Sequence, residues 1–225
     1  MNRDPIDKDA GYATAKALHK SAAVNAKYVG TDEQKVWNDF RSGDESAFIF
    51  IYSTYFYELI SFGLQFSLDK QLVEDCVQDL FIHIRRKREN LSPIKSSIRL
   101  YLFQALKRLV LDYKKKLRTV DLQPGREEYL FEVVMPREEH IINEQAYREK
   151  SEQLAKAIGR LTARQREAIY YLYYKSMTYE EIRIMMGLDN VKSARNLIYK
   201  AIAAMRPYIE YFSLILAFID LFPSV

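Results

Sequence analysis

Apolar side chains recur at steps of three and four residues along much of this 225-residue chain. That spacing is typical of α-helices that bury one face. In segment 48–62 the apolar face comprises Phe48, Ile51, Tyr52, Tyr55, Leu59 and Phe62. In segment 71–89 it comprises Leu72, Val73, Cys76, Val77, Leu80 and Ile84. No segment alternates apolar and polar residues as a half-buried strand would, so the sequence predicts an all-α fold.

Breaks in this pattern divide the chain into five parts. We expect a flexible N-terminal leader over residues 1–31 and a first helical domain over 32–117. A linker follows over 118–142, where proline and glycine interrupt a weakly periodic stretch. A second, smaller helical domain is expected over 143–207, and an apolar C-terminal tail over 208–225.

The formal net charge of +4 is distributed unevenly. Residues 85–118 carry 12 Lys and Arg against 2 Asp and Glu, whereas residues 119–150 carry 4 against 8. A dense positive segment favours a nucleic-acid surface, with an ordinary solvated face as the alternative. The linker between the two domains is correspondingly acidic.

The segment 178–202 has the outline of a helix-turn-helix. Thr178 and Glu181 have the spacing of a capping box, and Gly187 supplies the left-handed residue that ends a short helix. A second helix is predicted from about Asn190 to Met205. Its polar face carries donors suited to DNA, although a solvated face of a helix bundle would look similar. These residues are Lys192, Ser193, Arg195, Asn196, Tyr199 and Lys200.

Two arginines lie at the start of the preceding helix. Thr162 and Gln165 form a second predicted capping box, and Arg164 and Arg166 fall in the first turn after it. Free amides and the helix dipole favour an anion there, so these arginines are candidates for phosphate binding. Plain surface solubility is the alternative.

The helix over 71–89 presents an acidic face. Asp75, Gln78, Asp79 and Ile82 fall at positions i, i+3, i+4 and i+7, and Phe81 is expected to be exposed at the edge of this face. Carboxylates beside an exposed apolar residue suit a basic protein partner better than DNA. An ordinary acidic surface is the alternative.

Cations and aromatics alternate in the segment 97–116. Leu102, Leu106, Leu109 and Tyr113 fit a buried face. Tyr101 and Phe103 are interleaved with the cations, an arrangement that suits unstacked single-stranded bases, with core packing as the alternative. The cations expected to contact DNA are Arg99, Lys107, Arg108, Lys114 and Lys115.

Side chains that carry chemistry in enzymes are scarce. The single cysteine, Cys76, and the three histidines, His19, His83 and His140, lack the spacing of metal ligands. No glycine-rich phosphate loop or nucleophile motif is present. We therefore expect no enzymatic activity, cofactor, metal or small-molecule substrate. One free thiol and the lack of a secretory signal pattern favour the cytoplasm.

The order of these motifs resembles an extracytoplasmic-function sigma factor, a subunit of bacterial RNA polymerase built from sigma regions two and four. Asp75, Gln78, Asp79 and Phe81 match the family pattern Asp-x-x-Gln-(Asp/Glu)-x-Phe, which implies docking on the clamp coiled coil of the largest core polymerase subunit. Residues 98–116 are similar to the stretch that melts and binds the −10 element. Here Tyr101 replaces the usual Trp and Arg108 the usual Asn. The loop 90–97 would then capture a flipped base.

The second domain is similar to sigma region four over residues 161–206. The resemblance implies that the polar face of the 190–205 helix binds a duplex −35 element, and that the acidic linker threads through the RNA exit path of the polymerase. Together, the two regions imply an alternative sigma factor that directs core RNA polymerase to specific promoters. An inhibitory partner such as an anti-sigma factor is also expected.

The sequence leaves open the role of the C-terminal tail and two alternative functions of the protein. Residues 211–219 contain only one polar side chain, yet the apolar stretch is shorter than the roughly 20 residues that span a bilayer. We hypothesise that the tail covers a groove of the second domain or docks on an inhibitor, with completion of that domain's core as the alternative.

A stand-alone helix-turn-helix regulator with a helical sensor domain would bind duplex DNA without polymerase. An anti-sigma or membrane-linked signalling protein would be recovered with membranes.

Overall fold

The computed structural model describes residues 27–94, 96–120, 131–133 and 154–208. These residues form helices joined by loops, without a strand among them. The chain divides into two compact units, Met1–Gln123 and Pro124–Val225. The predicted all-α fold with two helical domains is therefore confirmed. Within the described residues, no helix is both long and apolar enough to span a membrane.

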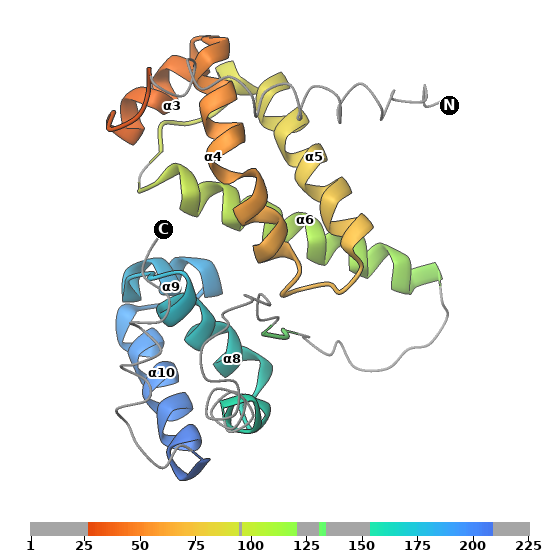
Figure 1. The fold of residues 1–225 in the computed structure, drawn as a ribbon, viewed down its shortest axis with the longest axis vertical. Helices are drawn as coiled ribbons and strands as arrows, with labels where there is room; N and C mark the ends of the chain where they lie inside the picture. The colour runs from red at the N-terminus through yellow and green to blue at the C-terminus, as the bar shows by residue number, and fades with distance from the viewer. Residues whose placement is uncertain (1–26, 95, 121–130, 134–153, 209–225) are drawn as a thin grey trace, which may run out of the picture. The chain divides into compact units, whose positions relative to one another are not determined.

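The described residues of the first unit form a bundle of four α-helices (Figure 1). These are α3 (Glu33–Arg41), α4 (Glu45–Gly63), α5 (Lys70–Arg86) and α6 (Ile98–Val120), with a short 3-10 turn, η1 (Arg88–Asn90), after α5. Helices α4, α5 and α6 pack pairwise against one another, and α3 covers the start of α4. Residues 48–62 lie within α4 as predicted, because the apolar stripe faces the other helices.

Two local features shape the junction between α4 and α5. A Cβ atom at Gly63 would lie 2.5 Å from a side-chain methyl of Val73, so only glycine allows α4 to approach α5 this closely. Helix α4 ends at this residue, as the sequence predicted. The Asp69 carboxylate then accepts a hydrogen bond from the backbone N–H of Leu72 and caps the first turn of α5.

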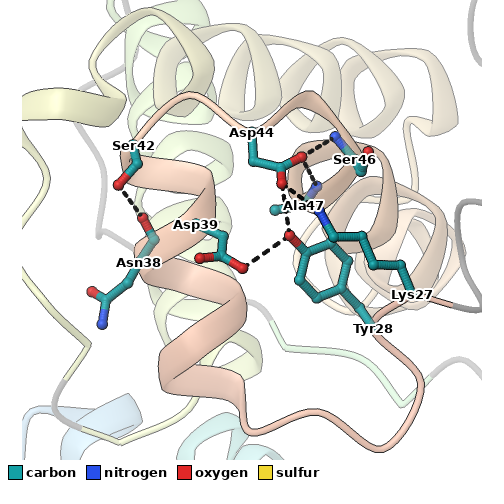
Figure 2. A network of polar contacts seen from close by, with 8 residues as sticks. All are labelled: Lys27, Tyr28, Asn38, Asp39, Ser42, Asp44, Ser46 and Ala47. Carbon is teal, nitrogen blue, oxygen red and sulfur yellow. Dashed lines mark hydrogen bonds and ion pairs between the residues drawn. The ribbon is translucent and has the colours of Figure 1, made fainter.

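The first domain begins earlier than predicted, because residues 27–28 are anchored on it (Figure 2). Tyr28 is 2% exposed, and its hydroxyl lies 3.0 Å from a carboxylate oxygen of both Asp39 and Asp44. The Lys27 ammonium forms an ion pair with Asp44 at 2.6 Å. The expectation of a flexible leader up to residue 31 is wrong for residues 27–31. Residues 1–26 lie outside the described part.

Asp44 joins this anchor to α4. One of its carboxylate oxygens accepts hydrogen bonds from the backbone N–H groups of Ser46 and Ala47, which caps α4, while the other faces Lys27 and Tyr28 (Figure 2). Donation from Lys27, then from Tyr28 and the backbone, holds the pKa of Asp44 well below its usual range. Burial chiefly raises the pKa of Tyr28 to about 12. The corner between α3 and α4 is therefore held by a carboxylate that stays ionised.

We expect Asp44→Ala to lower the free energy of unfolding at pH 7 by about 0.5–2 kcal/mol, the usual cost of losing a helix cap. Because the pKa of Asp44 is lower in the fold than in the unfolded chain, its stabilising effect is present above about pH 4 and declines as the pH falls through the folded pKa. Thermal unfolding of both proteins at pH 7 and at decreasing pH should show the difference shrinking in acid. Asp44→Asn, which retains a capping side chain, should cost less at pH 7. A difference independent of pH would contradict this role.

The second unit holds the predicted helix-turn-helix. Residues 154–159 are helical, followed by α8 (Ala163–Ile169), a π-helical turn η2 (Tyr170–Tyr174), α9 (Tyr179–Met186), α10 (Val191–Met205) and a short turn η3 (Arg206–Tyr208). Both predicted capping boxes are present, at the starts of α8 and α9. Gly187 has φ of 61° and ends α9, as predicted. Residues 209–225 of the predicted tail lie outside the described residues.

Helix α10 packs on α8 and α9 through its apolar face. Ala194, Ile198, Ala201 and Met205 are buried, and Asn190 caps the helix by accepting from the backbone N–H of Ser193. The predicted division of α10 into a packed face and a polar face is confirmed. The π-helical turn η2 was not predicted, because its four tyrosines and one leucine would fit an ordinary α-helix equally well.

Candidate partner-binding and nucleic-acid interfaces

The acidic face of α5 is present, and two of its carboxylates are held by neighbours. Asp75, Gln78, Asp79 and Ile82 are all partly exposed. The Gln71 amide donates to Asp75 at 3.0 Å, and the Tyr113 hydroxyl of α6 donates to Asp79 at 2.7 Å. These bonds limit the rotamers of both carboxylates before any partner arrives. Tyr113 is 36% exposed, so the prediction that it lies on the buried face of its helix is wrong.

Phe81 does not join this face, and the expectation that it is exposed is wrong. Its side chain is 2% exposed and packs on α4, with its ring centroid 4.6 Å from that of Tyr52 and 6.3 Å from that of Phe48. Because α4 and α6 both pack on α5, more of the helix surface is covered than a single apolar stripe suggests. Phe81 therefore packs behind the acidic face, covered by α4.

Two of the five cations predicted to contact DNA from α6 are engaged within the first domain. The Arg99 guanidinium forms a two-pronged ion pair with Glu58 of α4, with a shortest distance of 2.7 Å, and lies over the Phe103 ring. The Lys114 ammonium donates to the backbone carbonyl of Phe66 after the end of α4. The expectation that these two cations are free to meet phosphates is wrong. Both instead fasten α6 to the loop and helix beside it.

The other three cations of α6 reach the surface to different degrees. Arg108 and Lys115 are exposed, whereas Lys107 is half-buried with its ammonium 5.7 Å from the centroid of the Phe66 ring. The exposed positive charge of the helix is therefore concentrated toward its C-terminal half. Residues 117–120 belong to α6, but their side chains lie outside the described part.

The two aromatics that alternate with these cations have different surroundings. Phe103 is fully buried and stacks on Phe62 at a centroid distance of 4.2 Å, so of the two alternatives left open for it, core packing is the one observed. Tyr101 is half-buried and lies edge-on to Trp37 at 5.0 Å, and burial raises its pKa. Tyr101 thus keeps an exposed part beside the loop 90–97.

Trp37, which the sequence reasoning missed, positions that loop. Its indole N–H donates to the backbone carbonyl of Ser92 at 3.0 Å, and the ring is fully buried. Nearby, the Glu33 carboxylate accepts from the backbone N–H of Ile98 at 2.8 Å and so caps α6 from α3. The same carboxylate accepts from the Tyr55 hydroxyl at 3.0 Å. The only available signal was the apolar spacing of Val36, Trp37 and Phe40 in a short helix.

The polar face of α10 is displayed as predicted. Its exposed members are Lys192, Arg195, Asn196, Tyr199 and Lys200. Ser193 is half-buried, and its hydroxyl donates to the capping Asn190 side chain at 3.2 Å. The Arg195 guanidinium lies 5.2 Å from the centre of the Tyr179 ring of α9, which orients it. These are the donor types that bind base edges and phosphates in a major groove.

The arginines at the start of α8 differ in their contacts. Arg164 is exposed and donates to the backbone carbonyl of Met186 at 3.4 Å. Arg166 is half-buried, and its guanidinium donates to the carbonyls of Phe131 at 2.9 Å and of Leu161 at 3.2 Å. Two of the five N–H donors of Arg166 therefore bond backbone carbonyls, so this arginine is partly engaged within its own domain and is not a free surface cation. Phe131, predicted to lie in the linker, is fully buried within the second unit.

Comparison with protein families agrees with both halves of the chain. The family model for sigma-70 region 2 matches residues 51–119, and the model for sigma-70 region 4 matches residues 151–205. This chain belongs to the sigma-70 family. The two matched regions run from within α4 to the last turn of α6 and over the helix-turn-helix, and together they span more than half of the chain. The predicted identification as an extracytoplasmic-function sigma factor is confirmed.

Membership in the family decides among the functions that the sequence left open. The protein is an alternative sigma factor that binds core RNA polymerase and promoter DNA and directs transcription initiation. A stand-alone helix-turn-helix regulator would not account for the region 2 match in the first domain. Sigma factors as a family are initiation factors that act without enzymatic chemistry.

Two solved structures share the fold. The structure of CnrH in complex with the cytosolic domain of CnrY has a TM-score of 0.53 and 20% identity, covering 79% of this chain and 97% of that chain. The sigma factor RpoE of Bartonella quintana, in complex with the anti-sigma factor NepR, has a TM-score of 0.51 and 19% identity. The match covers 72% of this chain and 95% of the RpoE chain. No curated protein sequence matches the chain.

Proposed function

We propose that the three surfaces divide the work of this sigma factor among separate helices. The acidic face of α5 docks on core polymerase, the exposed part of α6 with the loop 90–97 holds the melted −10 element, and the polar face of α10 binds the duplex −35 element. The observation that carries this proposal is the separation of charge by helix. Carboxylates of α5 are held in place by Gln71 and Tyr113, whereas the exposed polar side chains of α10 are donors.

For polymerase docking, the proposed contacts are Asp75, Gln78, Asp79 and Ile82. Carboxylates that are already hydrogen-bonded within the free protein lose less conformational freedom when they meet a basic partner. A partner that supplies Arg or Lys would pair with these carboxylates, and the partly exposed Ile82 would add apolar contact. Phe81 contributes by keeping α5 seated against α4.

For the −10 element, we assign contact to Tyr101, Lys107, Arg108 and Lys115 and a structural role to Arg99 and Lys114. Tyr101 offers a partly exposed ring beside a loop that Trp37 fixes in place, which suits stacking of an unpaired base. The backbone between Ser92 and Ile98 is held at both ends, by the Trp37 indole and by the Glu33 carboxylate. Lys95, inside this loop, lies outside the described residues.

For the −35 element, the proposed contacts are Lys192, Arg195, Asn196, Tyr199 and Lys200, with Arg164 on the phosphates. Ser193 is assigned partly to the helix cap, since its hydroxyl bonds Asn190. The proposed domain roles follow from these surfaces, with the first domain serving polymerase and −10 binding and the second serving −35 binding.

We further propose that the protein acts by binding alone, in the cytoplasm, where promoter DNA and RNA polymerase are found. RpoE is found in complex with an anti-sigma factor, which supports an inhibitory partner of the same kind for this chain. Such a partner would compete with polymerase or DNA for the surfaces described above.

The two roles assigned to cations of α6 can be separated by salt dependence. Arg108→Ala should reduce the slope of log affinity against log salt by about one, because one phosphate contact is lost. Lys114→Ala should leave this slope unchanged and lower the thermal unfolding midpoint, because the Phe66 carbonyl loses its donor. The measurement is binding of the holoenzyme to a −10 probe with a melted segment at several salt concentrations. Equal slopes for both variants would contradict the assignment.

A further inference from the structure

We propose that Phe131 and Arg166 fasten the linker to the second domain, and that this anchor sets the range of promoter spacer lengths the protein accepts. The anchor leaves only residues 121–130 to join α6 to the second domain. The segment 118–142 therefore does not act as one uninterrupted tether. The inference uses the established sigma-factor activity and does not require the individual DNA contacts proposed above.

The first half of the anchor is an aromatic ring. Phe131 is fully buried within the second unit, although it follows an acidic, weakly periodic stretch. Its ring centroid lies 5.4 Å from that of Tyr170 and 6.4 Å from that of Tyr171, edge-to-face in both cases. Edge-to-face rings at these distances attract each other beyond the burial of their apolar area. Exposure of Phe131 would therefore remove a well-packed side chain from the domain.

The second half is a backbone clamp. The Arg166 guanidinium donates from Nε to the Phe131 carbonyl at 2.9 Å and from Nη1 to the Leu161 carbonyl at 3.2 Å. One side chain of α8 thus holds the linker backbone and the turn before α8 together. Hydrogen bonds from a charged donor are stronger than those between neutral groups. Phe131 is therefore fixed both through its ring and through its peptide group.

The local backbone supports this arrangement. Tyr170 and Tyr171 open the π-helical turn η2 directly after α8, and π-turns are rare and frequently found at functional positions. Consecutive side chains of an ordinary helix point about 100° apart, yet both of these rings contact Phe131. Tyr171 is itself held in place, because its hydroxyl donates to the buried Glu167 carboxylate at 2.6 Å.

The anchor shortens the reach of the chain. Eleven Cα–Cα steps separate Val120, the end of α6, from Phe131, and they span at most about 36–40 Å when fully extended. Without the anchor, the tether would run to residue 143, where the second helical domain is predicted to begin, 23 steps from Val120, which permits about 76–83 Å. An anchored chain therefore restricts how far the second domain can be placed from the first. Because the two domains bind separate promoter elements, this reach limits the spacer between the elements.

Paired insertions on either side of Phe131 test the anchor. We would insert ten Gly and Ser residues after Gly125 in one variant and after Glu139 in the other, and reconstitute each with core polymerase. For each variant we would measure the ratio of transcription from a promoter with an intact −35 element to transcription from one with a scrambled −35 element. This ratio is determined for promoters whose spacers are changed by one or two base pairs. The insertion before the anchor doubles the tether and should lower stimulation about threefold, with a broader spacer optimum. The insertion after the anchor should match wild type.

The two insertions also serve as controls for each other, since they have the same length and composition. In a Phe131→Ala background, both insertions should have the same small effect, about 1.7-fold, because the tether is then released up to the start of the second domain. Thermal unfolding of that variant shows whether the second domain remains folded, and the insertions into wild type do not depend on it. Equal effects of the two insertions in wild type, including no effect of either, would overturn the proposal. A wild type unresponsive to the −35 element would instead contradict the proposed −35 contacts.

Discussion

Replacing Asp75 and Gln78 with alanine should abolish capture of the protein by core RNA polymerase. Both side chains lie on the exposed face of α5, and Asp75 is oriented by Gln71. Truncation of central polar contacts in an interface commonly costs about 2–4 kcal/mol, which corresponds to roughly 30-fold to 1,000-fold in Kd. Neither residue is in the apolar core, so the variant should unfold at nearly the wild-type temperature.

A matched control for this result is Asp32→Ala with Gln34→Ala. It changes the same two residue types in the same domain, both are exposed, and Asp32 makes no side-chain cap to α3. Capture on immobilised core polymerase, with Kd from fluorescence anisotropy, should be unchanged for the control and lost for the α5 variant. Retention of wild-type affinity by the α5 variant would show that core polymerase docks on another surface.

Arg195→Ala should reduce recognition of the −35 element at one base pair. If the guanidinium donates to the edge of a guanine, its loss costs about 1–3 kcal/mol, or roughly 5-fold to 150-fold, against that base and little elsewhere. The ring of Tyr179 orients the guanidinium in the free protein, which lowers the entropic cost of the contact. The measurement is transcription by the reconstituted holoenzyme from a set of −35 elements with every single-base change.

Arg206→Ala is the matched control for the second prediction. Arg206 is also exposed and follows directly after α10, but it lies at the end of the helix away from the turn at Gly187. This control should transcribe all promoters in the set as wild type does. A uniform loss with Arg195→Ala on every −35 sequence would mean that Arg195 contacts phosphate and does not discriminate bases.

The sequence predicted the features that depend on neighbours along the chain. Capping boxes at Thr162 and Thr178, the left-handed Gly187 and the two faces of α10 all involve residues within a few positions of one another. Such local patterns are satisfied by neighbouring residues alone, and the structure shows each of them as predicted. The family resemblance, which also depends on local motifs in order, was confirmed for the same reason.

Apart from the π-helical turn η2, the main failures involve partners far away in the sequence. Arg99 pairs with Glu58, 41 residues away, Lys114 bonds Phe66, 48 residues away, and Arg166 bonds Phe131, 35 residues away. The sequence of one helix does not show whether another segment places a hydrogen-bond acceptor beside a cation, so such a cation is predicted to be available for DNA. The same limit explains Phe81, since the spacing within α5 does not show that α4 covers its flank. The roles assigned to the exposed residues stay predictions.

The position of Trp37 has a practical consequence for following this protein in solution. It is the only tryptophan of the chain, it is fully buried beside Tyr101, and its indole bonds the backbone of the 90–97 loop. Intrinsic tryptophan fluorescence is therefore a reporter of the first domain alone, at the loop proposed to receive a −10 base. The second domain contains tyrosines but no tryptophan, so it does not contribute to tryptophan emission. An unfolding curve followed by tryptophan emission therefore describes the first domain only.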